Sequence, residues 1–162
     1  LCYRGLGELD VAITHSIGVV LCGYVFLGGH WNHSLPWLLS LPLLLAILPS
    51  IILSGIPDME ADAQASKRTA AVLLGQRGAL ILALAFTVLS AAAALAGQIL
   101  GLANGALGGM AYAAIPHGAL LVWLLCRRMA SGKAPGRIDG LMIASLTYLL
   151  WFALIPMLRL AG

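Results

Sequence analysis

The sequence predicts an all-α protein, a polytopic transmembrane helix bundle with five spans. Hydrophobic residues make up 61% of the 162 residues and charged residues only 9%, whereas a soluble domain usually has about 25% charged residues. The mean hydropathy is +0.99. Five apolar runs are each long enough to cross a bilayer core, which takes about 20 helical residues. They are residues 11–28, 35–54, 79–97, 105–126 and 138–158.

The first two runs each contain residues that are unusual inside a membrane helix. His15 lies within residues 11–28. It has two interpretations, a neutral side chain bonded within the bundle or near the headgroups, and a contact to a polar acceptor substrate. The second run contains Pro36, Pro42 and Pro49. Because proline removes a helical hydrogen bond, we expect this helix to kink.

The remaining three runs have small residues suited to close helix packing. The Ala-rich half of residues 79–97 predicts close contact with a neighbouring helix. Gly105 and Gly109 form a small-xxx-small pair at the start of the fourth run, which predicts another such contact. His117, which follows Pro116, is interpreted as a packing or hydrogen-bonding residue.

Charged residues are distributed unequally between the two ends of this bundle. With five spans, one end carries all six acidic residues and eight of the nine basic ones, and the other end carries only Arg159. An excess of Lys and Arg marks the cytoplasmic side of membrane proteins. We therefore expect the start of the chain to be cytoplasmic and its end periplasmic. The eight basic residues are Arg4, Lys67, Arg68, Arg77, Arg127, Arg128, Lys133 and Arg137.

The polar stretch 54–78 carries the candidate chemistry. Asp58 and Asp62 are four residues apart, a spacing that puts both carboxylates on one face of a helix. Such a pair suits a hard cation such as Mg²⁺, whereas Glu60 would face away. Lys67 and Arg68 follow, with the positive charge that a diphosphate requires. The alternative is a polar loop between two membrane helices, where charges gather because water is present.

Two stretches resemble a known family. The run DMEADAQASKRTAAVLLG, residues 58–75, resembles the second aspartate-rich motif of the UbiA superfamily of intramembrane prenyltransferases. That motif reads D-x-x-x-D, a short gap, G-K-R-T and an apolar run ending in Gly; here Ser66 stands in place of the first Gly. YRGLGELDV, residues 3–11, resembles the loop before the fifth helix in one branch, the 1,4-dihydroxy-2-naphthoate polyprenyltransferases of menaquinone synthesis.

The resemblance implies a specific architecture and reaction. Residues 1–162 would be a single transmembrane domain, the C-terminal part of a fold of about nine helices. The N-terminal helices and the first aspartate-rich motif are expected in a missing N-terminal half. The implied reaction is Mg²⁺-dependent transfer of a polyprenyl group from an isoprenyl diphosphate to an aromatic acceptor, with 1,4-dihydroxy-2-naphthoate favoured. It would occur in a bacterial inner membrane, with the site facing the cytoplasm.

The resemblance also implies roles for individual residues. Asp58 and Asp62 would be metal ligands and catalytic, and Lys67 and Arg68 would bind the diphosphate. Tyr3 and Arg4 would face the diphosphate or the acceptor. Because half of the metal site is missing, residues 1–162 alone are expected to be inactive.

Two alternatives to this reaction stay open. The acceptor could be another aromatic ring such as 4-hydroxybenzoate, or the chain could belong to a non-catalytic membrane subunit or a transporter. Every acidic residue lies at one edge of the spans, which argues against an ion path through the bilayer. The basic residues have no aromatic interleaving, so the lipid bilayer rather than nucleic acid is the expected partner. The three scattered cysteines are interpreted as free thiols.

Overall fold

The structure is a computed structural model that describes residues 2–132 and 138–161. Within these residues the chain is helical, without a strand. The apolar composition explains this, because a helix satisfies all its backbone hydrogen bonds internally where no water is present. In chain order the elements are η1 (Cys2–Arg4), α1 (Gly7–Ile13), η2 (Thr14–Gly18), α2 (Val19–Phe26), α3 (Ser34–Ser54), α4 (Met59–Gln64), α5 (Ala70–Ile99), η3 (Ala103–Gly105), α6 (Met110–Ala130) and α7 (Asp139–Ala161).

The predicted polytopic bundle with five spans is confirmed. α1, η2 and α2 join into one span, Gly7–Phe26, and the other four spans are formed by α3, α5, α6 and α7. The ends of the spans differ from the prediction. α5 begins at Ala70, where the Thr69 side chain accepts a hydrogen bond from Val72 N, but Gly75 interrupts it, so only the part after Gly75 corresponds to the span predicted from residue 79.

The prediction for Gly105 and Gly109 is wrong. Both glycines have left-handed backbones, with φ of +80° and +82°, and they precede α6 instead of forming part of it. A left-handed residue cannot continue a right-handed helix, so these glycines shape the loop. Close helix approach occurs elsewhere. A Cβ on Gly118 in α6 would lie 3.4 Å from the Tyr148 ring of α7.

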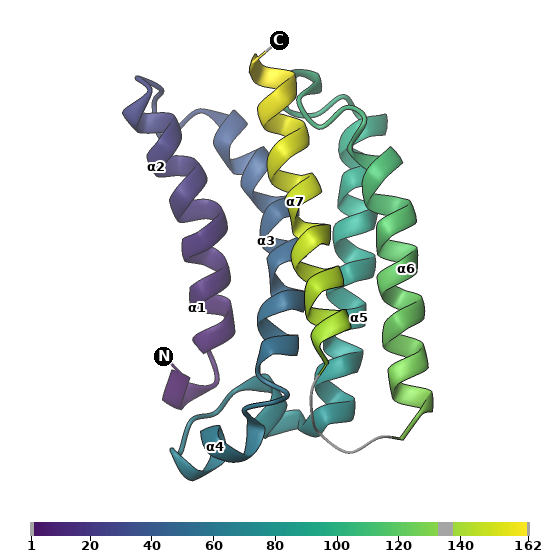
Figure 1. The fold of residues 1–162 in the computed structure, drawn as a ribbon. Coiled ribbons are helices and arrows are strands. Elements are labelled where there is room, and N and C mark those ends of the chain that lie inside the picture. Colours follow the sequence, from purple (N-terminus) through teal and green to yellow (C-terminus); the bar gives the residue numbers. More distant parts are fainter. Residues whose placement is uncertain (1, 133–137, 162) are drawn as a thin grey trace.

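α3 is the central helix of the bundle. It packs against the first span, α5 and α7, while α6 packs against α5 and α7 (Figure 1). The core contains Leu53, Leu121, Tyr148 and Phe152, all almost fully buried. Many large apolar side chains face outward, as expected of a protein whose surroundings are lipid tails.

Some polar side chains inside the spans form hydrogen bonds between helices. The Tyr148 hydroxyl lies 2.8 Å from Ser90 Oγ, which joins α7 to α5. Trp151 Nε1 donates to His117 Nδ1 at 2.9 Å, and His117 Nε2 lies 3.0 Å from the Ala144 carbonyl, which joins α7 to α6. The interpretation of His117 as a hydrogen-bonding residue is therefore confirmed.

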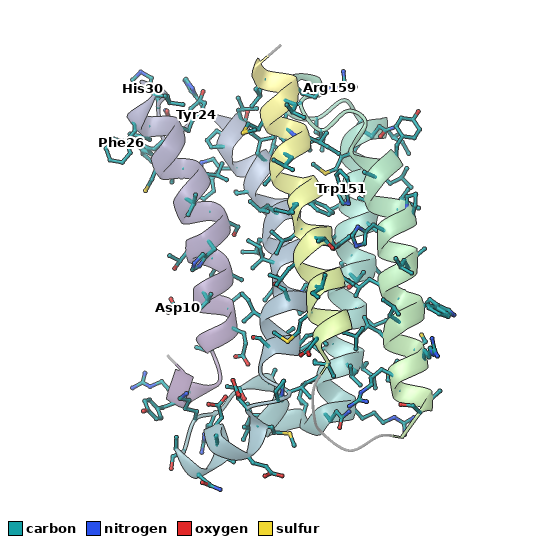
Figure 2. All side chains as sticks on the ribbon, in the orientation of Figure 1. Asp10, Tyr24, Phe26, His30, Trp151 and Arg159 are labelled. Atoms are coloured by element: carbon teal, nitrogen blue, oxygen red, sulfur yellow. The ribbon has the colours of Figure 1, made fainter. Side chains whose placement is uncertain are left out.

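The two ends of the bundle differ in charge as predicted. The N-terminus, α4 and the start of α7 lie at one end, and the loops before α3 and α6 lie at the other with the C-terminus (Figure 1). We call the first the aspartate end. Arg159 lies at the opposite end, beside the loop before α6 (Figure 2). Lys133 and Arg137, two of the eight basic residues assigned to the aspartate end, are outside the described residues.

Candidate functional site

The two aspartates lie one turn apart at the start of α4. Asp62 N donates to the Asp58 carbonyl at 2.8 Å. Asp58 directly precedes the helix, with φ of −93° and ψ of 3°, and its side chain is exposed. Asp62 lies within the helix and is buried. The spacing thus produced the local helix that it suggested, although Asp58 marks its start and is not inside it.

Lys67 is paired with Asp62. Its Nζ donates to Asp62 Oδ1 at 2.8 Å, and its backbone N donates to the Asp62 carbonyl at 2.9 Å. Between them the chain reverses at Ser66, whose φ of +59° is in the left-handed region that favours glycine. The second aspartate-rich motif has Gly at this position, and the left-handed backbone of Ser66 gives a physical reason for that preference.

The first loop packs against the segment that follows Lys67. Glu8 accepts a hydrogen bond from Ala70 N, the first residue of α5, at 2.5 Å. A Cβ on Gly5 would lie 3.2 Å from Leu73 Cδ1 and 3.7 Å from the Arg68 carbonyl. The two stretches that carry the family resemblance, far apart in the sequence, are therefore in contact.

Glu8 lies in the candidate site, and sequence reasoning did not include it there. Its carboxylate lies at the N-terminus of α5, where helix dipole and unpaired N–H groups favour negative charge. The available signal was its place in the GLGE stretch beside Tyr3 and Arg4. The sequence of that stretch does not show which backbone amide donates to the Glu8 carboxylate.

The other predicted site residues are exposed at the same end. Tyr3, Arg4 and Arg68 are all exposed. For their side chains the described part of the chain contains no hydrogen bond or ion pair. The structure thus joins Lys67 to Asp62 and leaves two guanidinium groups and a phenol open to an incoming anion.

The two aspartates fit part of a magnesium site. Among the described residues, no group of three or more His, Cys, Asp or Glu side chains could hold a metal. Mg²⁺ commonly takes one or two carboxylates and completes its octahedron with substrate phosphates and water. Asp58 and Asp62 supply hard oxygen donors of that kind, so the remaining ligands would come from elsewhere.

A cavity of about 830 Å³ lies between the first span, α3 and α7. Its lining is apolar except for His15, Tyr24 and Ser50. Val11 and Ile51 also line it, and each lies about one helical turn from the aspartate end of its helix. The cavity therefore begins about one helical turn inside the aspartate end and runs along the spans.

The family model described as the UbiA prenyltransferase family matches residues 1–146. The chain belongs to the UbiA prenyltransferase family. The match includes both stretches of the aspartate end and most of the cavity lining. Family members transfer prenyl groups to aromatic acceptors, and the five spans agree with a multi-pass membrane protein. The comparison with curated proteins and the comparison with solved structures each gave no match.

Proposed function

We propose that this UbiA-family chain is the C-terminal part of an enzyme that transfers a polyprenyl group from an isoprenyl diphosphate to 1,4-dihydroxy-2-naphthoate. One observation carries the proposal. The Glu8 bond to Ala70 N brings the first loop onto the Lys67–Thr69 segment, where Lys67 pairs with Asp62, and an apolar cavity begins about one helical turn deeper, at Val11 and Ile51. Such an arrangement suits a substrate with an anionic head and a hydrocarbon tail.

The basic residues would bind the diphosphate. Arg4 and Arg68 are exposed at this end, and guanidinium groups match phosphate oxygens bidentately. Lys67, whose Nζ donates to Asp62 Oδ1 at 2.8 Å, would add its positive charge beside these guanidinium groups. Tyr3 would donate its phenol hydrogen to a diphosphate oxygen or to the acceptor. These donors stabilise the negative charge that grows on the diphosphate as it leaves.

Asp58 and Asp62 would hold Mg²⁺, which when bound supplies positive charge opposite the diphosphate. The carboxylates also need a neighbour that keeps them in place before substrate arrives. Lys67 has that role for Asp62, at 2.8 Å. A first aspartate-rich motif in a longer polypeptide would supply the further ligands, so residues 1–162 alone would be inactive.

The cavity would accommodate the tail and protect the reactive carbon. When the allylic C–O bond breaks, the diphosphate takes the electron pair and leaves an allylic cation. A carbon of the aromatic ring forms the new C–C bond, and the ring then releases a proton. Water would capture the cation, so the apolar lining from α3, α7 and the first span is what such a reaction requires.

The acceptor and the location rest on separate arguments. The resemblance of residues 3–11 to the 1,4-dihydroxy-2-naphthoate branch favours that ring and menaquinone synthesis, with 4-hydroxybenzoate as the alternative. The excess of basic residues at the aspartate end favours a site on the cytoplasmic face of a bacterial inner membrane.

The test is transfer of a labelled prenyl diphosphate to each acceptor, in membranes that contain the full-length protein, with and without Mg²⁺. We expect Asp58→Asn and Asp62→Asn to slow turnover by several orders of magnitude, because the charge they help to offset appears mainly as the diphosphate leaves. Glu60→Gln is the matched control on the same turn and should cost much less. Robust activity of the double aspartate variant would remove these residues from the mechanism. A wild-type protein inert toward every aromatic acceptor would favour a non-catalytic subunit.

A further inference from the structure

The polar residues that line the cavity are His15, Tyr24 and Ser50, and they differ in their hydrogen bonds. Ser50 Oγ donates to the Ile47 carbonyl at 2.8 Å, and the Tyr24 hydroxyl bonds to His33 Nδ1 at 2.8 Å, so both hydroxyls already have partners. The His15 ring lies 2.9 Å from the Val11 carbonyl through Nδ1 alone. In the part of the chain that the structure describes, Nε2 has no bonding partner.

The hydrogen bond to Val11 determines the tautomer of His15. A carbonyl oxygen can only accept, so Nδ1 must carry the hydrogen. In a neutral imidazole the other nitrogen then has a lone pair and no hydrogen. His15 is exposed and lines the apolar cavity, so Nε2 is a hydrogen-bond acceptor that a donating ligand can reach.

The backbone around His15 is also unusual. Residues Thr14–Gly18 form a turn of π-helix within the first span. Such turns are rare and occur often at functional sites, because the extra residue changes which side chains face a neighbour. Here the turn packs against α3 with Ser16 buried, and His15 lines the cavity.

The depth of His15 separates it from the diphosphate. It follows Glu8 by seven residues, which is about 10 Å along a helix, and Glu8 marks the level of the Lys67–Thr69 segment. A ring that attacks the carbon next to the diphosphate would lie just inside that level. Its far substituents would then extend toward His15.

Among the substrates of the proposed reaction, only the acceptor has a group that matches Nε2. An ionised diphosphate and an ionised carboxylate can only accept hydrogen bonds, and a prenyl tail has no polar group. A ring hydroxyl is a donor. We propose that His15 Nε2 accepts a hydrogen bond from a hydroxyl of the aromatic acceptor, and so selects and orients a hydroxylated ring. This inference rests on the proposed function.

The experiment compares three ligands and three variants in the full-length protein. The ligands are 1,4-dihydroxy-2-naphthoate and its two monomethyl ethers, and binding is measured by calorimetry without prenyl diphosphate. His15→Phe removes the acceptor nitrogen and keeps an apolar ring, His15→Gln keeps an acceptor oxygen, and Thr14→Val is the matched control. Thr14 is the preceding residue, is exposed, and bonds to the Asp10 carbonyl outside the cavity.

We expect His15→Phe to weaken binding of the dihydroxy acceptor about three- to tenfold, the ordinary range for one hydrogen bond. Binding of the ether that lacks the relevant hydroxyl should be weak in the wild type and unchanged in the variant. In the transfer assay KM for the acceptor should rise, while KM for the prenyl diphosphate stays constant. His15→Gln should recover much of the affinity, and Thr14→Val should equal the wild type.

The outcomes separate this inference from the proposed function. A wild type that transfers prenyl groups while His15→Phe and His15→Gln bind the acceptor as the wild type does would overturn the role of His15 alone. If His15→Phe lowers the affinity for the dihydroxy acceptor and for both ethers by the same factor, the role of His15 is also overturned. The imidazole would then act through the shape of the cavity or through bound water. A wild type that transfers to no aromatic ring would overturn both.

Discussion

Ser66 adopts a backbone conformation that its side chain disfavours. Its φ is +59°, and the left-handed region costs a residue with a Cβ about 1–2 kcal/mol. Glycine avoids this cost, but its greater conformational freedom in the unfolded chain lowers the free energy of unfolding by about 0.4–1 kcal/mol. We expect Ser66→Gly to raise the free energy of unfolding by about 0.5–1 kcal/mol, measured by thermal or denaturant unfolding in detergent micelles.

The neighbouring Ala65 provides the control. It is exposed, like Ser66, but its φ of −79° is one that any residue adopts. Ala65→Gly should therefore lower the free energy of unfolding, because only the entropic cost remains. If the two glycine variants change stability equally and in the same direction, the backbone of Ser66 is not the cause.

At the scale of single residues, the sequence predicted the local geometry of the two aspartates better than their contacts. The spacing of Asp58 and Asp62 predicts one helical turn between them, and Asp62 N bonds to the Asp58 carbonyl as that turn requires. It does not predict that Asp62 is buried and pairs with Lys67, because that pairing depends on the reversal at Ser66. Whether both carboxylates face one metal stays a prediction.

At the scale of elements, the start of α5 is a separate segment. Gly75 has φ of 68° and ψ of 171°, which interrupts the helix, so Ala70–Leu74 forms an arm before the long membrane-spanning part. Only glycine tolerates this backbone conformation well. The arm follows Lys67 and Arg68 directly, and it is attached to the first span by Glu8. The position of the basic pair therefore depends on a carboxylate of another helix.

We expect Glu8→Ala to release this arm. A hydrogen bond to a charged group contributes about 1.5–3 kcal/mol, so exchange of the Ala70 amide should accelerate roughly ten- to hundredfold. Hydrogen exchange with mass spectrometry over residues 66–76 measures it. Asp10→Ala is the matched control, since Asp10 lies in the same first turns of α1, is exposed and lies on the outer side of the helix (Figure 2). Equal exchange in the two variants would contradict this role for Glu8.

The elements differ in how well sequence predicts them. Five long apolar runs predict five spans, because a continuous apolar run of about 20 residues is the signature of a membrane-spanning helix. The ends are harder to predict, as Gly105 and Gly109 show, since a glycine pair suits a helix contact and a left-handed loop equally well. No sequence pattern predicts the π-helical turn at Thr14–Gly18. The bond between Glu8 and Ala70 joins residues 62 positions apart, so local sequence does not predict it.

At the scale of the whole molecule, the charge asymmetry predicts an orientation in the membrane. We expect single cysteines in the loops at 29–34 and 98–104 to react with an impermeant reagent applied from outside the cell. A cysteine in the exposed turn at 63–66 should react only after lysis. The measurement needs a background in which Cys2, Cys22 and Cys126 are replaced, since Cys22 and Cys126 are exposed and free. The reverse pattern of labelling would invert the assignment of the aspartate end to the cytoplasm.

The bond between Glu8 and Ala70 also has a consequence for synthesis at the ribosome. Its two partners are 62 residues apart, with two membrane spans between them. At about 5–20 residues per second, roughly 3–12 s pass between the synthesis of one partner and that of the other. During that interval the first span is completed, while the Glu8 carboxylate has no Ala70 amide from which to accept a hydrogen bond. The α4 loop is therefore synthesised before its attachment to the first span can form. It must stay undamaged until α5 has been synthesised.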